Sequence, residues 1–291
     1  MPKVSVLMPV YNTRPEHLRE AVQSVLSQTF TDFELLILND GSTVQGLEEV
    51  VRSFHDPRIV YAENERNLGI SRTRNRLMDM ARGEYFAVMD HDDVSLPERL
   101  EKQTAFLDAH PEVWVLGCQF STMDRPGVSR LPLDDVTIKE ALLVHCGDMC
   151  HPATMLRRSV LVENGIRYEE MFSPAEDHAL FCRLIPFTMF AALPDRLFMY
   201  RSWSGNTSHR RARTMEAAKQ GVLCFARRDN PELWAMARTK LLEIRRYRLL
   251  GLPLLTVTRT YKETRWLLFD VIPLWMGRTS LPRITGREEK K

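Results

Sequence analysis

The sequence contains no long hydrophobic run. Hydrophobic residues make up 44% of the 291 positions, which is ample for a globular core, but no apolar run approaches the roughly 18 residues that a membrane-spanning helix needs. The apolar run at residues 4–10 is too short, with Pro9 close by, to act as a signal peptide. We therefore expect a cytoplasmic protein.

Paired cysteines are also missing. The chain has five cysteines, an odd number, and no Cys-x-x-Cys pair, which indicates reduced thiols. One group, His145, Cys146, Cys150 and His151, contains the residue types that bind zinc, but its spacing matches no standard zinc site. Zinc binding is therefore only a minor alternative for this segment.

A large net charge is absent as well, but the balance hides two unequal parts. The whole chain carries a net charge of +2. Residues 1–200 hold 20 Lys and Arg against 30 Asp and Glu, a net charge of −10, whereas residues 201–291 hold 20 against 8, a net charge of +12. The C-terminal part is thus a separate electrostatic region.

This basic region lacks a recognisable nucleic-acid motif, so no nucleic-acid partner is expected. Its arginines are interleaved with leucines and tryptophans, as in helices that lie in a membrane interface. We expect a helical region over residues 209–291 that docks on an anionic membrane, peripheral at its inner face. The alternative is that the apolar residues pack on the rest of the chain or in the seam of a homo-oligomer.

Short apolar runs alternate with amphipathic helical segments over the first half of the chain. This alternation predicts an α/β fold with a doubly wound, mostly parallel sheet. The expected strands are residues 4–8, 33–39, 59–63, 85–89 and 113–118, and the expected helices are residues 15–28, 47–54, 71–80, 97–110 and 136–144.

Residues 85–93 form the most informative segment. The apolar run from Tyr85 to Met89 favours a buried strand, and three carboxylates follow it within four residues. Ligands of open α/β sheets bind beyond the carboxyl ends of strands, where Asp90 and Asp92 can offer oxygen to Mg²⁺ or Mn²⁺ on a phosphate. The implied ligand is a nucleoside diphosphate. The alternatives are a solvated turn or the start of the next helix.

Three further loops follow expected strands at the same edge. Tyr11 could cover a nucleobase and Asp40 could accept hydrogen bonds from the base or ribose, although Asp40 also stands in an ordinary Asp-Gly-Ser turn. After the third strand, Arg72 and Arg74 could hold phosphate near a helix start. A solvated helix face explains these arginines equally well.

Residues 173–177 predict a helix start that requires no catalytic role. Ser173 would cap the helix, Pro174 would take its first position and Glu176 would complete a capping box. Asp177 is not explained in this way and is a candidate general base. Residues 200–208 then form a polar, aromatic loop of the kind that closes over a bound ligand.

Together these motifs resemble the inverting family 2 of nucleotide-sugar glycosyltransferases with the A-type fold, which includes bacterial enzymes that build capsule, lipopolysaccharide and lipo-oligosaccharide. The resemblance runs over residues 3–208 and indicates a catalytic domain at residues 1–208. It rests on Val4–Asn12, Leu26–Phe30, Asp40–Ser42, Asn67–Gly69, Asp90–Asp93, His151–Arg158 and the pair Glu176 and Asp177.

The resemblance implies a role for each matching residue. Asp177 would be the catalytic base that takes the proton of the acceptor hydroxyl, and Asp92, with Asp90, would hold Mn²⁺ or Mg²⁺. The implied acceptor-side residues are His151, Glu176 and Trp203. The implied donor-binding residues are Pro9, Tyr11, Asn12, Asp40, Asn67, Arg74, Asp90, His91 and Arg201.

The implied activity is metal-dependent transfer of a hexose or N-acetylhexosamine, with inversion, from a nucleoside-diphosphate donor, UDP for preference. The acceptor would be a glycan or lipid-linked glycan in surface-polysaccharide or lipopolysaccharide synthesis. Two alternatives stay open, a polyprenyl-phosphate sugar synthase and a catalytically silent nucleotide-sugar-binding protein. Trp203 departs from the family, whose members commonly have histidine there, while Asn206 and Ser208 keep the rest of the loop pattern.

Overall fold

The computed structural model describes residues 1–124, 127–144, 149–203, 212–240, 243–249, 252–259, 263–268 and 272–278, and from residue 238 onward only their helices and strands. The chain separates into two compact units, Met1–Asn230 and Pro231–Lys291. The first unit contains every predicted site residue. His145 and Cys146 of the zinc alternative, and Asn206 and Ser208 of the closing loop, lie outside the described residues.

Four parallel strands form the first half of the main sheet. β1 (Val4–Val10) lies between β2 (Phe33–Asn39) and β4 (Tyr85–Val88), and β3 (Ile59–Glu63) pairs with the other side of β2. All four were predicted at these positions. The strands β1 and β2 are buried along their whole length, as expected for parallel strands covered on both faces.

The register of these strands places predicted site residues at one edge of the sheet. Val10 and Asn39, the last residues of β1 and β2, are paired, and β4 runs beside β1 in the same direction. The segments that begin at Tyr11, Asp40 and Asp90 therefore leave the sheet at its carboxyl edge. This is the edge at which open α/β sheets bind ligands.

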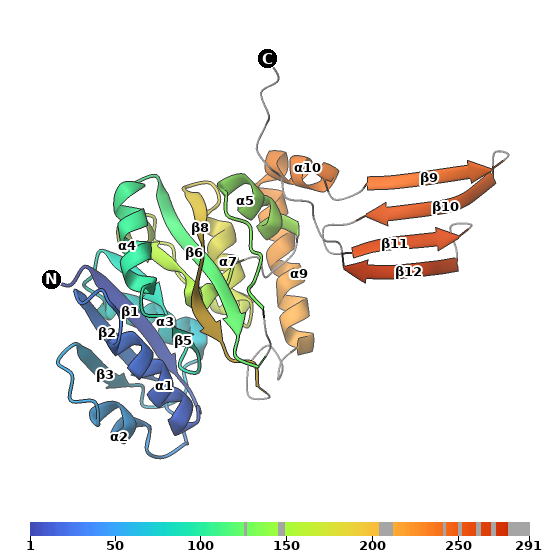
Figure 1. Cartoon of the computed structure of the whole chain (residues 1–291). Helices are drawn as coiled ribbons and strands as arrows, with labels where there is room; N and C mark the ends of the chain where they lie inside the picture. The colour runs from blue at the N-terminus through green and yellow to red at the C-terminus, as the bar shows by residue number, and fades with distance from the viewer. Residues whose placement is uncertain are drawn as a thin grey trace. The chain divides into compact units, whose positions relative to one another are not determined.

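Helices connect the parallel strands as the sequence predicts. They are α1 (Pro15–Leu26), α2 (Leu47–Arg52) and α3 (Ile70–Met80). Figure 1 shows α1 and α2 beside β1 to β3. Leu18, Ala21, Val22 and Val25 of α1 are all buried, a spacing that puts one apolar helix face against the sheet.

The second half of the main sheet mixes strand directions. β6 (Val113–Thr122) and β8 (Met189–Tyr200) are parallel, whereas β7 (Met155–Arg157) is antiparallel to both β4 and β6, and β5 (Val94–Ser95) is antiparallel to β8. The strand order is β3-β2-β1-β4-β7-β6-β8-β5. The predicted α/β class is confirmed, with two short antiparallel strands added.

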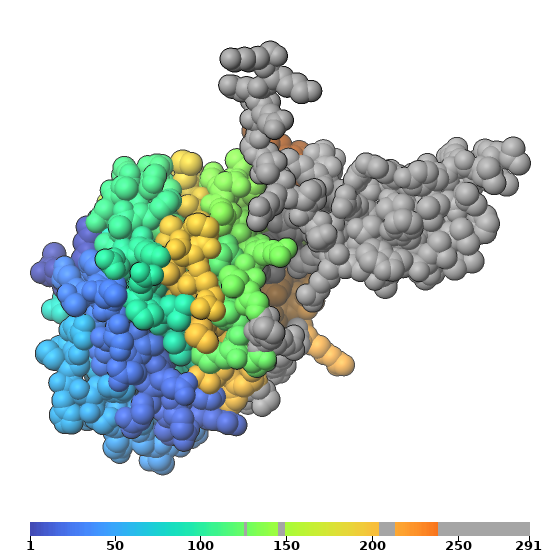
Figure 2. Space-filling model, viewed as in Figure 1, coloured from blue at the N-terminus to red at the C-terminus, as the bar shows by residue number. Residues whose placement is uncertain are grey.

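Further helices cover the second half of the main sheet. In the space-filling view, the residues of the second half form one continuous surface with those of the N-terminal half (Figure 2). Of these helices, α5, α7 and α9 pack on one another. They are α4 (Arg99–Ala109), α5 (Asp135–Val144), α6 (Arg158–Glu163), α7 (Glu176–Leu184) and α9 (Ala212–Asp229), with the 3-10 turns η1 (His151–Ala153) and η2 (Glu170–Phe172).

The C-terminal region differs from the prediction. α9 and α10 (Pro231–Lys240) are helical as expected, but an antiparallel sheet of order β12-β11-β10-β9 follows. The helical prediction is therefore wrong beyond residue 240, and with it the picture of interfacial helices there. The strands are β9 (Glu243–Leu249), β10 (Leu252–Arg259), β11 (Glu263–Leu268) and β12 (Ile272–Arg278).

The sequence contains a reason for these strands. Residues 255–258 read Leu-Thr-Val-Thr, and β-branched residues favour extended backbone. The predicted domain boundary at residue 208 also precedes α9, which packs with α7 and α5 in the first unit. No helix in the described ranges is long and apolar enough to cross a membrane.

Candidate active site

Carboxylates are concentrated where β4 ends. Asp92 is 8% exposed and Asp93 is completely buried, while Asp90 is half-buried. Burial raises the pKa of Asp90, with Arg74 opposing the shift and Asp92 adding to it, and burial raises the pKa of Asp93 well above its usual range. A nearby positive charge would stabilise the ionised form of these carboxylates.

Arg74 of α3 joins this loop to the second acidic segment. Its Nη1 donates to Oε1 of Glu176 at 2.7 Å and its Nη2 donates to Oδ1 of Asp90 at 3.3 Å. The guanidinium also lies over the ring of Tyr168, 5.4 Å from its centroid. Burial opposes the charge, yet the carboxylates of Asp90 and Glu176 raise the pKa of Arg74. The buried cation thus holds two acidic segments together at one place.

Glu176 and Asp177 have different surroundings at the start of α7. The N-cap residue is Ala175 and makes no side-chain cap bond, so the predicted capping box is wrong, because Glu176 reaches Arg74 instead. Burial raises the pKa of Glu176 even though Arg74 opposes the shift. Asp177 is half-buried, and its Oδ1 accepts a hydrogen bond from the backbone N–H of His178 at 2.7 Å. Asp177 is therefore the more accessible carboxylate of the pair.

Asp40 fixes the loop that follows β3. Its Oδ1 accepts hydrogen bonds from Asn64 Nδ2 at 2.7 Å and from the backbone N–H of Leu68 at 2.9 Å, and its Oδ2 accepts from the N–H of Gly69 at 3.0 Å. Asn67, in the middle of this loop, is exposed. The structure therefore gives Asp40 a positioning task, and its contact with a nucleobase stays a prediction.

Gly41 allows the loop after β2 to touch the loop after β3. Its φ is +63°, and a Cβ there would lie 2.5 Å from the carbonyl carbon of Arg66. Asn12, with φ of 47°, ties the end of β1 to the same turn, since its Oδ1 accepts from the backbone N–H of Thr43 at 2.8 Å. Pro9 is buried in β1, whereas Tyr11 beside Asn12 is 43% exposed. An exposed aromatic ring at this edge suits a base-covering role.

The segment after β8 returns to the Asp90–Asp93 loop. The backbone N–H of Arg201 donates to Oδ1 of Asp93 and its Nε donates to the carbonyl of Asp92, both at 2.7 Å, and its guanidinium pairs with Glu20 of α1. The indole Nε1 of Trp203 donates to Oδ2 of Asp92 at 2.8 Å. Trp203, predicted on the acceptor side, thus contacts a predicted metal ligand.

His151 lies one layer further in. It is 3% exposed, and its Nε2 is 2.8 Å from the hydroxyl of Tyr168. Burial, assisted by the positive charges of Arg74 and Arg99, lowers the pKa of His151 well below its usual range. The neutral imidazole therefore supports Tyr168, which in turn contacts Arg74.

Arg99 anchors the Asp90–Asp93 loop from below. The side chain is 1% exposed, and its Nη2 donates to the carbonyls of Val88 at 2.8 Å and Thr154 at 3.1 Å. Its Nη1 donates to Ser95 Oγ at 2.9 Å and its Nε to Gln103 Oε1 at 3.1 Å. These bonds clamp both ends of the loop, because Val88 precedes it and Ser95 follows it.

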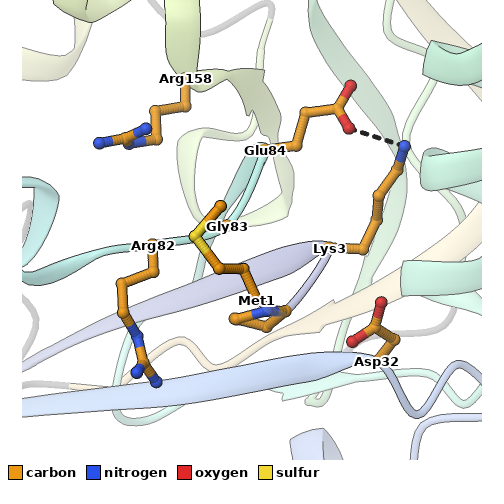
Figure 3. Close-up of a pocket in the computed structure, with 8 residues that line it drawn as sticks. Met1, Lys3, Asp32, Arg82, Gly83, Glu84 and Arg158 are labelled. Atoms are coloured by element: carbon orange, nitrogen blue, oxygen red, sulfur yellow. Dashed lines mark hydrogen bonds and ion pairs between the residues drawn. The ribbon is translucent and has the colours of Figure 1, made fainter.

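A cavity of ≈ 270 Å³ lies at the opposite edge of the sheet. It is lined by residues that precede β1 and β4, among them Lys3, Arg82 and Glu84. Figure 3 shows Lys3 pointing to Glu84, and Arg82 pointing away from that pair. Because these are the amino ends of parallel strands, this cavity is separate from the predicted site.

Residues 5–165, more than half of the chain, match the sequence model of the family described as glycosyl transferase family 2. The chain belongs to this family. The matched region begins at the second residue of β1, includes β2 to β4, Arg74 and the Asp90–Asp93 loop, and ends before Glu176 and Trp203.

Relatives with similar sequences are also named glycosyltransferases. The chain is 30% identical over 190 residues to an uncharacterized glycosyltransferase of Methanocaldococcus jannaschii, covering 63% of this chain and 65% of the relative. It is 33% identical over 161 residues to the putative glycosyltransferase EpsE of Bacillus subtilis, covering 54% and 57%. It is 29% identical over 213 residues to the amylovoran biosynthesis glycosyltransferase AmsE of Erwinia amylovora, covering 71% and 79%. The match spans less than two thirds of the first two relatives.

Solved structures confirm the fold. TarS residues 1–349 of S. aureus, crystallised with UDP-GlcNAc, superimposes with a TM-score of 0.61 at 24% identity, covering 70% of this chain and 60% of that one. The mannosyltransferase PcManGT of Pyrobaculum calidifontis, solved with GDP-Man and Mn²⁺, gives 0.56 at 16% identity, covering 82% and 73%. The main sheet therefore has the A-type glycosyltransferase fold that the motifs predicted.

Within this family member, the predicted residues fall into connected groups. One hydrogen-bonded group gathers around the Asp90–Asp93 loop and a second around Asp40, whereas Tyr11 and Asn67 are exposed and His91 has a buried Nδ1 without a partner in the described part of the chain. Sequence reasoning missed Tyr168, which has no local motif. It also missed Arg99, the one charged side chain among the buried positions of α4.

Proposed function

We propose that the chain transfers a sugar, with inversion, from a nucleoside-diphosphate sugar to a hydroxyl of a glycan. The observation that carries this proposal is the buried bridge from Asp90 through Arg74 to Glu176. It joins a loop suited to a cation and a diphosphate to a helix start that presents an accessible carboxylate. Such an edge brings together the donor-side and acceptor-side chemistry that sugar transfer requires.

Asp177 is the proposed general base. Its neighbour Glu176 is bound by Arg74, whereas Asp177 is half-buried and, among the described residues, accepts a hydrogen bond from the N–H of His178. Asp177 takes the proton of the acceptor hydroxyl while that oxygen forms a bond to the anomeric carbon. The bond from this carbon to the diphosphate breaks, and the nucleoside diphosphate leaves. A positioned base of this kind contributes about 10² to 10⁴-fold in rate.

Asp92 and Asp90 fit a divalent cation. Each supplies a carboxylate, a hard oxygen ligand. The described residues contain no cluster of three or more His, Cys, Asp or Glu side chains that could hold a metal, so substrate would have to supply the remaining ligands. A site with two carboxylates is typical of Mg²⁺ or Mn²⁺ that completes its coordination with substrate phosphate. When bound, the cation offsets the charge that grows on the leaving diphosphate.

The donor is proposed to be a UDP-linked hexose or N-acetylhexosamine. Support comes from the family membership and from the exposed Tyr11 beside the turn that Asp40 and Gly41 build. We place the acceptor in surface-polysaccharide or lipopolysaccharide synthesis, since AmsE is named for amylovoran biosynthesis and another relative, WcaA of Escherichia coli, for colanic acid biosynthesis.

The working location we propose is the cytoplasmic face of a membrane. The net charge of +12 over residues 201–291 suits an anionic surface, where each basic residue contributes about 1 kcal/mol. That surface would bring the enzyme to a lipid-linked acceptor. Association of the basic region with a second copy of the chain is the competing proposal, and sedimentation with and without anionic vesicles separates the two.

A panel of nucleotide sugars tests the donor proposal. Thermal unfolding of the full chain is followed with UDP- and GDP-sugars, each with and without Mn²⁺. A true donor at 100-fold over its dissociation constant adds about 2.7 kcal/mol of stability, and this gain should require Mn²⁺. The stabilising donor is then offered with glycan acceptors and, in a separate arm, polyprenyl phosphate. Transfer to polyprenyl phosphate alone, or a panel in which nothing stabilises the chain, would refute the proposal.

A further inference from the structure

Trp203 has a defined position between α1 and the Asp90–Asp93 loop. The guanidinium of Arg14 lies 5.1 Å from the centroid of the indole, and the ring of His17 meets it edge on, 5.2 Å away at 81°. Contacts of this kind orient an aromatic ring. The direction of the indole N–H is therefore set by α1 as well as by its acceptor.

The acceptor is one particular oxygen of Asp92. The indole Nε1 donates to Oδ2 at 2.8 Å, and no described residue donates to Oδ1. The backbone of Asp92 is held too, because Arg201 donates to its carbonyl. One carboxylate oxygen is thus engaged, and the other remains available to a ligand.

We propose that Trp203 positions the Asp92 carboxylate for the divalent cation. The indole N–H occupies Oδ2 and leaves Oδ1 to ligate the metal. This inference rests on the proposed function, because it requires that Asp92 bind a cation. Trp203 does not touch the reacting atoms in this scheme and acts only through Asp92.

The chemistry of indole suits this task. An indole N–H is a donor only, whereas histidine can accept a proton or ligate a metal itself. Trp203 therefore keeps its hydrogen bond to Asp92 without competing for the cation. Partners that orient metal ligands in this way contribute roughly 10- to 100-fold to metal affinity.

The test measures Mn²⁺ affinity directly. The full chain is titrated with Mn²⁺ in excess UDP, and in a parallel series in GDP, and free Mn²⁺ is read from its electron paramagnetic resonance signal. Trp203→Phe keeps an aromatic ring between Arg14 and His17 but removes the N–H. Trp114→Phe is the matched control, because the Trp114 indole donates to the carbonyl of Pro111 at 3.1 Å, away from the site. Thermal unfolding establishes that each variant is folded.

We expect Trp203→Phe to weaken Mn²⁺ binding about 10- to 100-fold, with no change in Trp114→Phe. Wild-type affinity in Trp203→Phe, together with lost binding in Asp92→Asn, would overturn this inference and leave the proposed function intact. If the wild type binds no Mn²⁺ with either nucleotide, or Asp92→Asn binds it normally, the metal site and the inference both fall.

A second variant separates the hydrogen bond from the packing of the ring. Arg14→Gln removes the cation over the indole but leaves its N–H. The expected result is a smaller loss of Mn²⁺ affinity than in Trp203→Phe. An equal loss would assign the effect to ring packing and would overturn the role given to the N–H.

Discussion

Two buried glutamates at opposite edges of the main sheet have opposite ionisation behaviour. Glu34, near the amino edge, accepts hydrogen bonds from Ser5 Oγ at 2.7 Å and from the backbone N–H, Nε and Nη2 of Arg82 at 2.7 to 2.9 Å. Although burial opposes ionisation, these bonds lower the pKa of Glu34. Glu176, at the carboxyl edge, accepts one side-chain hydrogen bond among the described residues, from Arg74, and burial raises its pKa.

The difference teaches that an arginine partner does not by itself lower the pKa of a buried carboxylate. Every lone pair that loses water needs a replacement, and Glu34 has four donors. Glu176 has one side-chain donor, Arg74, and its Oε2 is buried without a partner among the residues described. The hydrogen bonds to Glu34 therefore stabilise its charge at the amino edge, whereas the charge of Glu176 at the carboxyl edge is only partly compensated.

The largest expected effect tests the accessible neighbour of Glu176. Asp177→Asn should lower sugar transfer by about 10² to 10⁴-fold, because the amide cannot take the proton of the acceptor hydroxyl. Donor binding should survive. Turnover with a verified acceptor and a thermal-shift titration with the donor measure the two quantities. Near wild-type turnover would remove Asp177 as the base.

The second effect compares the two arginines. Arg74→Met should lower the free energy of unfolding by about 3 to 5 kcal/mol, since it leaves Glu176 and Asp90 without their cation. Arg82→Met should cost less, because Glu34 keeps the Ser5 hydroxyl and the backbone N–H at position 82 and the Arg82 side chain is 62% exposed. Urea unfolding of both variants measures the two losses in the free energy of unfolding. Equal losses would contradict the comparison.

The third effect concerns the metal. Asp92→Asn should lose the Mn²⁺-dependent part of donor stabilisation, which is about 2.7 kcal/mol for the wild type at 100-fold over its dissociation constant. Asp108, which pairs with Lys3 beside the start of β1, provides the control, and Asp108→Asn should keep the gain. Retention of the gain in Asp92→Asn would mean that another group holds the cation.

The smallest effect is a pH dependence of opposite sign at the two glutamates. The lowered pKa of Glu34 means that its contribution is present above the unfolded value and is lost as pH falls, whereas the raised pKa of Glu176 means that its contribution is present at low pH and is lost as pH rises. Between pH 3 and 7, Glu34→Gln should therefore flatten the rise of stability with pH, and Glu176→Gln should steepen it.

Urea unfolding along this pH series measures both slopes, and one unit of pKa difference corresponds to about 1.4 kcal/mol. Slopes that change in the same direction in the two variants would show that the two carboxylates share one environment after all.

The first half of the sheet could be predicted from sequence because each strand there is a short apolar run bounded by polar residues. β8 was missed, since Pro194, Asp195 and Arg196 interrupt its apolar pattern. β5 and β7 contain only two and three residues, which is too few for a periodic signal. In the C-terminal strands, arginines are mixed with leucines and tryptophans as in an amphipathic helix, and this pattern conceals the strand preference of their β-branched residues.

The site was predicted in pieces. Motifs indicate Asp90, Asp92 and Asp177 as candidates, because these carboxylates follow strand or helix boundaries. The bond from Arg74 to Glu176 joins residues 102 positions apart, and nothing local marks such a pair. At Glu176 the local capping pattern was complete, so it concealed the long-range partner.

The clamp formed by Arg99 has a consequence for anyone who wishes to change donor preference by directed evolution. Its guanidinium ties the carbonyl of Val88, before the Asp90–Asp93 loop, to the hydroxyl of Ser95 after it. A library that varies position 99 would therefore yield inactive clones in which every ligand-facing residue is still wild type. Diversity is better placed on the exposed residues that we propose contact the donor, such as Tyr11 and Asn67, whose side chains can change without moving the backbone that presents the carboxylates.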